Sequence, residues 1–171
     1  MQKECECIMF GKLKNLFSQP GITIASPASG TVVPLTEVPD PTFAQGILGP
    51  GAAVQPNEGR IVAPANGTVD MMFDTGHAVS MTTSEGAELL IHIGIDTVNL
   101  KGQHYTAKCK SGDTVRKGDT LIEFDIDAIR EAGYEVVTPV IVCNPDAFAS
   151  VKTEDAGSVQ AGDDLLTLEK K

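Results

Sequence analysis

Ser26-Pro-Ala-Ser-Gly-Thr-Val32 returns later in the chain as Ala63-Pro-Ala-Asn-Gly-Thr-Val69, with five of the seven positions identical. A second repeat relates Thr114-Val-Arg-Lys-Gly-Asp-Thr-Leu-Ile122 to Ser158-Val-Gln-Ala-Gly-Asp-Asp-Leu-Leu166. Each unit combines a turn, in which glycine is free to adopt positive φ, with an apolar strand-like segment. Two such units facing each other would bury a shared core, so the repeats predict an internally duplicated fold.

The chain around the repeats reads as many short strands. Clusters of Val, Ile and Thr alternate with Gly, Pro, Asn and Asp, which is typical of strands joined by turns. We expect strands over 22–26, 31–35, 68–73, 78–83, 88–93, 120–124, 140–143 and 165–168. One short helix is predicted over 126–132, with Asp125 as its cap and Gly133 at its end. The predicted fold class is all-β, a β-sandwich or barrel-sandwich hybrid with internal duplication and at most one or two short helices.

Composition excludes several classes of protein. The 171 residues are 42% hydrophobic and 21% charged, which suits one compact domain with a short tail. The formal net charge of -10 argues against nucleic-acid binding through a basic face. No run approaches the about 18 apolar residues of a membrane-spanning helix. The start has no apolar signal region, so we expect a cytoplasmic protein with reduced cysteines, which are Cys5, Cys7, Cys109 and Cys143.

The N-terminal segment differs from the rest in its pattern. Residues 10–17 place apolar side chains at positions 10, 13, 16 and 17 with lysines between them, which is helical spacing. A basic amphipathic stretch of this kind is compatible with weak association with an acidic membrane surface. We therefore expect a flexible tail over 1–21, amphipathic over 10–17, followed by one folded domain over 22–171.

The histidines are the strongest candidates for chemistry. His92 lies in a predicted strand, where it shares one face with Leu90 and Gly94 among aliphatic neighbours. Restricted access to water lowers the pKa of an imidazole and leaves it neutral and nucleophilic near pH 7. His77 lies just before the preceding predicted strand, whereas His104 lies in a polar loop and is expected to be solvated.

A turn at Ser84-Glu85-Gly86 predicts a hairpin that brings His77 and His92 onto adjacent strands. If paired positions sum to an odd number, the two imidazoles point to the same face of the hairpin. An even sum would send them to opposite faces. The turn residues alone leave this parity open.

Two facing imidazoles suit two kinds of chemistry. In phosphoryl transfer one histidine attacks and the other stabilises the phosphoryl oxygens, and no nucleotide-binding loop is needed. In a zinc hydrolase a third protein ligand is usual. Asp96 would reach such a metal only if the chain bends at Gly94, and the chain lacks a His-x-His motif.

Several linked motifs resemble one known family. They are Val38-Pro-Asp-Pro-Thr-Phe43, Asp74-Thr-Gly-His77, His92-Ile-Gly-Ile-Asp-Thr-Val98 with Lys101-Gly102, Lys117-Gly-Asp-Thr-Leu-Ile-Glu-Phe-Asp125, and Thr138-Pro-Val140. Together, in this order, they look like the glucose-family enzyme IIA of the bacterial phosphoenolpyruvate:sugar phosphotransferase system. The similarity extends over nearly the whole body of the chain, from about residue 22 to 170.

The resemblance implies a phosphotransferase component that acts as a carrier. His92 would accept a phosphoryl group from the phosphohistidine carrier protein HPr, as tele-phosphohistidine, and pass it to a cysteine of the IIB domain of a glucose-type sugar permease. His77 would stabilise the phosphoryl group, Thr75 would orient His77, and the carbonyl of Gly94 would hold the other ring nitrogen of His92. The implied partner-binding residues are Asp40, Phe43, Ile47, Phe73, Leu90 and Asp96.

The same resemblance sets the expectations for cofactors and partners. No cofactor and no resident metal are expected, although adventitious or partner-shared zinc at His77 and His92 is compatible with the residues. Regulated transporters or metabolic enzymes are further candidate partners. The alternative from another class is a zinc-dependent hydrolase of the peptidoglycan-endopeptidase kind. The sugar is selected by the membrane subunit, so it is not encoded here.

Overall fold

The structure is a computed structural model that describes residues 21–171. In chain order its strands are β1 (Ile22–Ala25), β2 (Gly30–Pro34), β3 (Gly51–Pro56), β4 (Arg60–Val62), β5 (Gly67–Met72), β6 (Ala78–Thr83), β7 (Glu88–His92), β8 (Tyr105–Ala107), β9 (Thr114–Val115), β10 (Thr120–Phe124), β11 (Thr138–Val142), β12 (Phe148–Thr153), β13 (Gly157–Val159) and β14 (Asp164–Lys170). The described part also holds the α-helices α2 (Pro41–Ala44) and α3 (Ile126–Glu131) and the 3-10 helices η1 (Leu35–Glu37), η2 (Thr97–Leu100) and η3 (Pro145–Ala147).

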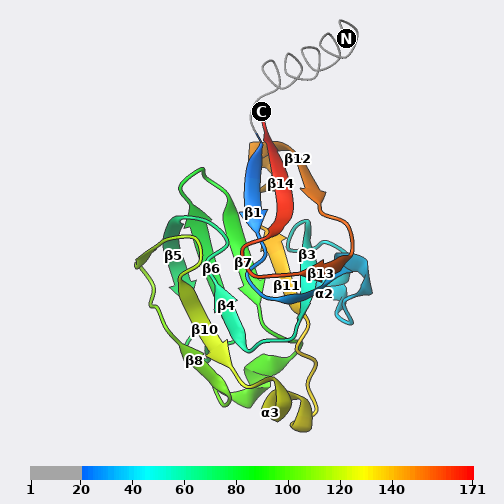
Figure 1. Ribbon diagram of the computed structural model, residues 1–171, viewed down its shortest axis with the longest axis vertical. Coiled ribbons are helices and arrows are strands. Elements are labelled where there is room, and N and C mark those ends of the chain that lie inside the picture. The colour runs from blue at the N-terminus through cyan, green and yellow to red at the C-terminus, as the bar shows by residue number, and fades with distance from the viewer. Residues whose placement is uncertain (1–20) are drawn as a thin grey trace, which may run out of the picture.

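The strands form one large sheet and two small ones. The large sheet has the order β13-β2-β3-β11-β7-β6-β5-β9, and the small sheets have the orders β1-β14-β12 and β4-β10-β8. All the pairings are antiparallel. The start of β1 lies beside the C-terminal strand, where Ile22 pairs with Leu168 (Figure 1). The predicted all-β sandwich is therefore confirmed.

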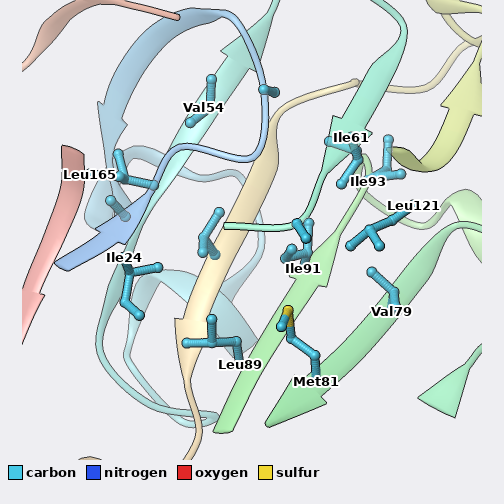
Figure 2. Close-up of a cluster of buried hydrophobic side chains, with 14 of the residues drawn as sticks. Ile24, Val54, Ile61, Val79, Met81, Leu89, Ile91, Ile93, Leu121 and Leu165 are labelled. Atoms are coloured by element: carbon cyan, nitrogen blue, oxygen red, sulfur yellow. The ribbon is translucent and has the colours of Figure 1, made fainter. Parts of the chain in front are cut away.

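The main core lies on the inner face of the large sheet. Alternate residues of its strands point inward and meet apolar side chains from both small sheets (Figure 2). Burial of this apolar surface is the main source of stability for such a fold. Figure 2 labels Ile24, Val54, Ile61, Val79, Met81, Leu89, Ile91, Ile93, Leu121 and Leu165 in this core.

The two sequence repeats occupy equivalent places. The N–H of Ser26 donates to the carbonyl of Asp163 at 2.6 Å, and the N–H of Ala63 donates to that of Asp119 at 2.8 Å. The strand that begins within the first repeat, β2, lies between β13 and β3, and the strand that begins within the second, β5, lies between β9 and β6. The same pattern of turns and neighbours thus occurs twice, and the predicted internal duplication is confirmed.

The predicted strands are all present, with ends that differ by at most two residues. Helix α3 also forms as expected: the Asp125 carboxylate accepts a bond from the N–H of Ala128 at 3.0 Å, and Gly133 follows with φ of 93°. Sequence reasoning missed α2 and the strands β3, β4, β8, β9, β12 and β13. The alanines of β3 have weak strand propensity, but both of its faces are covered in the fold.

A second, smaller apolar cluster lies on the outer face of the large sheet. There Val38 and Phe43, from the segment that contains η1 and α2, pack on Ala53 of β3 and Ile141 of β11. Asp40 begins α2 by accepting a bond from the N–H of Thr42 at 2.9 Å. This cap holds Phe43 on the sheet.

Two further expectations concern the N-terminal tail and membrane-spanning helices. The tail expected over 1–21, with its amphipathic stretch over 10–17 and with Cys5 and Cys7, lies outside the described residues except for Gly21. Among residues 21–171, no helix has the length and apolar character that crossing a membrane requires.

Candidate active site

His92 is the last residue of β7 and points to the outer face of the large sheet. The neighbouring Leu89 and Ile91 point into the main core, as the alternation of the strand predicts. The Nδ1 atom of His92 donates to the carbonyl of Gly94 at 2.7 Å. A carbonyl only accepts, so Nδ1 carries the proton and the lone pair lies on Nε2.

Gly94 adopts a backbone conformation that few other residues tolerate. Its φ is 85°, and a methyl group added to it would lie 2.5 Å from the carbonyl oxygen of Glu135. The chain bends here and turns the carbonyl of Gly94 back toward His92. Glycine is therefore required for the bond that selects the tautomer of His92.

His77 lies in the bend before β6 and is only 4% exposed. Its Nδ1 atom is hydrogen-bonded to the Thr75 hydroxyl at 2.5 Å. Thr75 and Gly76 precede it in a tight turn in which Gly76 has φ of 68°. The Nε2 atom is thereby left as the ring nitrogen available to a substrate.

The two imidazoles meet in spite of the hairpin register. Ala78 pairs with His92, so the pair sum is even, and simple alternation would place His77 on the opposite face from His92. The ring centroids are nevertheless 5.0 Å apart with an interplanar angle of 83°. The prediction from alternating faces is wrong here because His77 lies before the first residue of β6. The turn at Gly76, and not the pleat of the strand, sets the direction of its side chain. Its carbonyl still accepts a bond from the N–H of Ile93 at 2.7 Å.

Two phenylalanine rings pack against the histidine pair, one on each imidazole. The ring centroid of Phe43 lies 5.2 Å from that of His92, and the ring of Phe73 meets His77 edge-on at 5.5 Å. Phe43 is itself buried, so it forms part of the outer cluster as well as the wall of the site. The walls limit the access of water to both imidazoles, which strengthens electrostatic interactions within the site.

Burial keeps both imidazoles neutral. Burial, together with a smaller effect of the neighbouring His92, lowers the pKa of His77 from 6.5 to about 4. Burial also lowers the pKa of His92, against the opposing effects of the Gly94 hydrogen bond and of the Asp40 and Asp96 carboxylates. Near pH 7 the pair therefore presents two uncharged rings, one of which has a free lone pair.

The pKa of His77 predicts a pH-dependent stability. Between about pH 4 and 6.5 the unfolded chain binds a proton at this residue that the folded chain excludes. The stability contributed by neutral burial is complete above that window and is lost as the pH falls through it, by at most about 1.4 kcal/mol per pH unit. We expect the free energy of unfolding in urea to fall less between pH 7.5 and 4.5 for His77→Gln than for wild type. An equal fall in both proteins would contradict this.

The remaining predicted partner-binding residues occupy varied positions. Asp40 caps α2 as well as influencing His92, and Asp96 is exposed with φ of 59° at the start of η2. Ile47 is 67% exposed in the loop after α2. Leu90 is half-buried and packs against the outer cluster. The structure thus places Asp40 and Asp96 within electrostatic reach of His92, and Ile47 on the open surface.

Sequence reasoning missed the groups behind the site. The hydroxyls of Thr97 and Tyr105 both donate to the carbonyl of Ile93, at 2.7 and 3.0 Å. No sequence pattern marks such bonds, because they depend on where η2 and β8 meet the end of β7. The exposed apolar side chains of Leu48, Met71 and Val98 were also missed.

The histidine pair has no further metal-binding side chain grouped with it. Within residues 21–171 no group of three His, Cys, Asp or Glu side chains is arranged to hold a metal ion. His104 is exposed in the loop before β8, with φ of 75°. What the site presents is one half-buried nucleophilic nitrogen, on His92, beside a ring nitrogen of His77, which suits transfer of a group onto and off the His92 ring.

Comparison with known proteins gives a consistent result. The family model described as phosphoenolpyruvate-dependent sugar phosphotransferase system, EIIA 1, matches residues 22–148. The PTS system glucose-specific EIIA component of Oceanobacillus iheyensis is 44% identical over 158 residues, which are 90% of this chain and 96% of that protein. The solved structure of glucose permease IIA from Mycoplasma capricolum superposes with a TM-score of 0.81 at 30% identity, covering 86% of this chain and 96% of that one.

Longer relatives contain a similar segment. The PTS system beta-glucoside-specific EIIBCA component of Bacillus subtilis (strain 168) is 48% identical over 145 residues, which are 85% of this chain. This chain spans only about a quarter of the length of that protein, 24% of it. None of these comparisons supports the hydrolase alternative.

Proposed function

Because the chain belongs to the EIIA 1 family of the phosphoenolpyruvate-dependent sugar phosphotransferase system, whose members are phosphoryl carriers, we propose that His92 is the residue that carries the phosphoryl group. The main structural support for this proposal is the hydrogen bond from Nδ1 of His92 to the carbonyl of Gly94. It leaves the lone pair on Nε2, at the face shared with His77.

The transfer step follows from this tautomer. The Nε2 lone pair of His92 attacks the phosphorus of a phosphohistidine on the donor, HPr, as the donor's own N–P bond breaks. The electron pair of that bond stays on the donor's ring nitrogen. The His92 ring now bears a positive charge, and its Nδ1–H bond to the Gly94 carbonyl becomes a stronger, charge-assisted one. No cofactor of the chain itself is needed.

His77 acts on the phosphoryl oxygens. When the Thr75 hydroxyl donates to Nδ1 of His77, the ring proton lies on Nε2. We expect this Nε2–H to donate to an oxygen of a phosphoryl group on His92, a role supported by the 5.0 Å between the two ring centroids. A fixed donor in a site shielded from water stabilises the charge that the phosphoryl oxygens carry during transfer.

The surface around the histidines suits docking of protein partners. Phe43 and Phe73 form apolar walls, Ile47 is exposed, and Asp40 and Asp96 contribute negative charge. Such a surface favours partners with an apolar patch bordered by basic groups. We assign HPr as the phosphoryl donor and a cysteine of a permease IIB domain as the acceptor. Support for the acceptor comes from the relatives whose names combine EIIB, EIIC and EIIA in one chain.

The test is the mass of the intact protein after incubation with phosphoenolpyruvate, enzyme I and HPr. We expect a gain of one phosphoryl group that is lost in mild acid, as a histidine–phosphorus bond would be. A control without HPr separates direct labelling by enzyme I from the proposed route. No gain, with enzyme I and HPr shown to be active together, would overturn the proposal.

A further inference from the structure

Both polar groups of the peptide unit between Ile93 and Gly94 are hydrogen-bonded. Its carbonyl oxygen accepts bonds from the hydroxyls of Thr97 at 2.7 Å and Tyr105 at 3.0 Å. Its N–H donates to the carbonyl of Val137 at 3.1 Å. Three hydrogen bonds to one peptide leave it little freedom to rotate. The next carbonyl along the chain, that of Gly94, is the one that receives Nδ1 of His92.

Tyr105 also lies against the turn that carries His77. A methyl group on Gly76 would come within 3.2 Å of the Cβ atom of Tyr105, so the two backbones pack closely. Behind the site the Tyr105 ring stacks on Phe124 of the main core, with centroids 6.2 Å apart and an angle of 25°. One side chain therefore connects the core to both of the loops that hold the histidines.

We propose that Tyr105 is a positioning residue for phosphoryl transfer, whose hydroxyl holds the Ile93–Gly94 peptide so that His92 keeps its Nε2 lone pair. This inference rests on the proposed function and deepens it. If that peptide rotates, the Gly94 carbonyl turns away from Nδ1, and the ring is free to move its proton to Nε2. That second tautomer has no lone pair at Nε2 with which to attack phosphorus.

The Tyr105 hydroxyl is suited to this role over a wide pH range. Burial raises its pKa to about 12, against a smaller opposing effect of the neighbouring Thr97 hydroxyl, so the Tyr105 hydroxyl keeps its proton and remains a donor. Thr97 gives the same carbonyl a second donor. Removing the Tyr105 hydroxyl alone should therefore weaken the hold on the peptide without abolishing it.

The experiment compares Tyr105→Phe with Tyr134→Phe. The first substitution keeps the ring and its stacking on Phe124 and removes only the hydroxyl. Tyr134 is the other tyrosine of the chain and packs against the same core, which makes its variant a matched control. The readouts are the tautomer of His92 by nitrogen NMR of the unphosphorylated protein, and the rate of acceptance from phosphorylated HPr in a single turnover.

For Tyr105→Phe we expect the ratio of the Nε2–H to the Nδ1–H tautomer of His92 to rise by between about twofold and tenfold, with acceptance slowed by a similar factor. Tyr134→Phe should change neither. Adding Thr97→Val to Tyr105→Phe removes the remaining donor and should enlarge both effects. A lower melting temperature with an unchanged tautomer ratio would show a purely structural role and overturn the inference, as would a changed tautomer with unchanged acceptance. Because the NMR readout needs no phosphoryl donor, failure of this inference is distinguishable from failure of the proposed function.

Discussion

Replacing His92 with alanine is expected to abolish phosphorylation, so that the mass of the protein does not change in the presence of phosphoenolpyruvate, enzyme I and HPr. The reason is chemical: of the two imidazoles of the site, only the His92 ring has its proton held on one nitrogen by a backbone carbonyl and a free lone pair on the other. His77 cannot replace it, because a Thr75 hydroxyl that donates to its Nδ1 atom leaves the ring proton on Nε2, where no lone pair is then free to attack.

The matched control is His104→Asn. His104 is exposed and has φ of 75°, a backbone conformation that asparagine tolerates better than alanine. This variant should gain one phosphoryl group at the wild-type rate. Labelling of His92→Ala at the wild-type level would show that another residue carries the group and would refute the assignment.

Replacing His77 with glutamine is expected to separate acceptance of the phosphoryl group from its onward transfer. Glutamine retains an N–H that donates to a phosphoryl oxygen, so His92 should still become phosphorylated. It has no ring for Thr75 to orient, so its N–H is not held in one position as the thiolate of the acceptor approaches. Loss of a preorganised donor in a shielded site commonly slows a reaction by about 100-fold or more, and because the glutamine N–H is not preorganised we expect onward transfer to fall by up to about that factor.

The measurement for His77→Gln uses protein that is first phosphorylated and separated from HPr. The decay of the phosphorylated form is then followed after a purified IIB domain is added. Thr75→Val serves as the graded control, because it keeps the imidazole and removes only the hydroxyl that orients it, and its effect should be smaller. Wild-type transfer by His77→Gln would remove the role assigned to His77.

Local sequence patterns were sufficient for eight of the strands in the described part of the chain, for the helix cap and for the duplication. Alternation in 88–92 placed Leu89 and Ile91 on the opposite face from His92, because side chains of a strand point to alternate faces, and the structure shows that their face is the inner one. The cap at Asp125 and the repeated turns depend only on neighbours along the chain. Such features are short-range, so the sequence carries them directly. Strands such as β3 were missed because their stability depends on burial by distant segments.

The contact between His77 and His92 could not be predicted from the sequence pattern, which left open whether the two imidazoles share a face of the hairpin. Register alone would separate the two rings, and only the bend at Gly76 brings His77 to the side of His92. The wall at Phe43 likewise depends on α2, which sits on the outer face of a sheet whose strands come from distant parts of the chain. The sequence by itself therefore determined the all-β duplicated fold and named the residues of the site through its motifs. The tertiary structure alone decided their distances, their burial and the tautomer of His92, because these depend on contacts between segments that local periodicity does not encode.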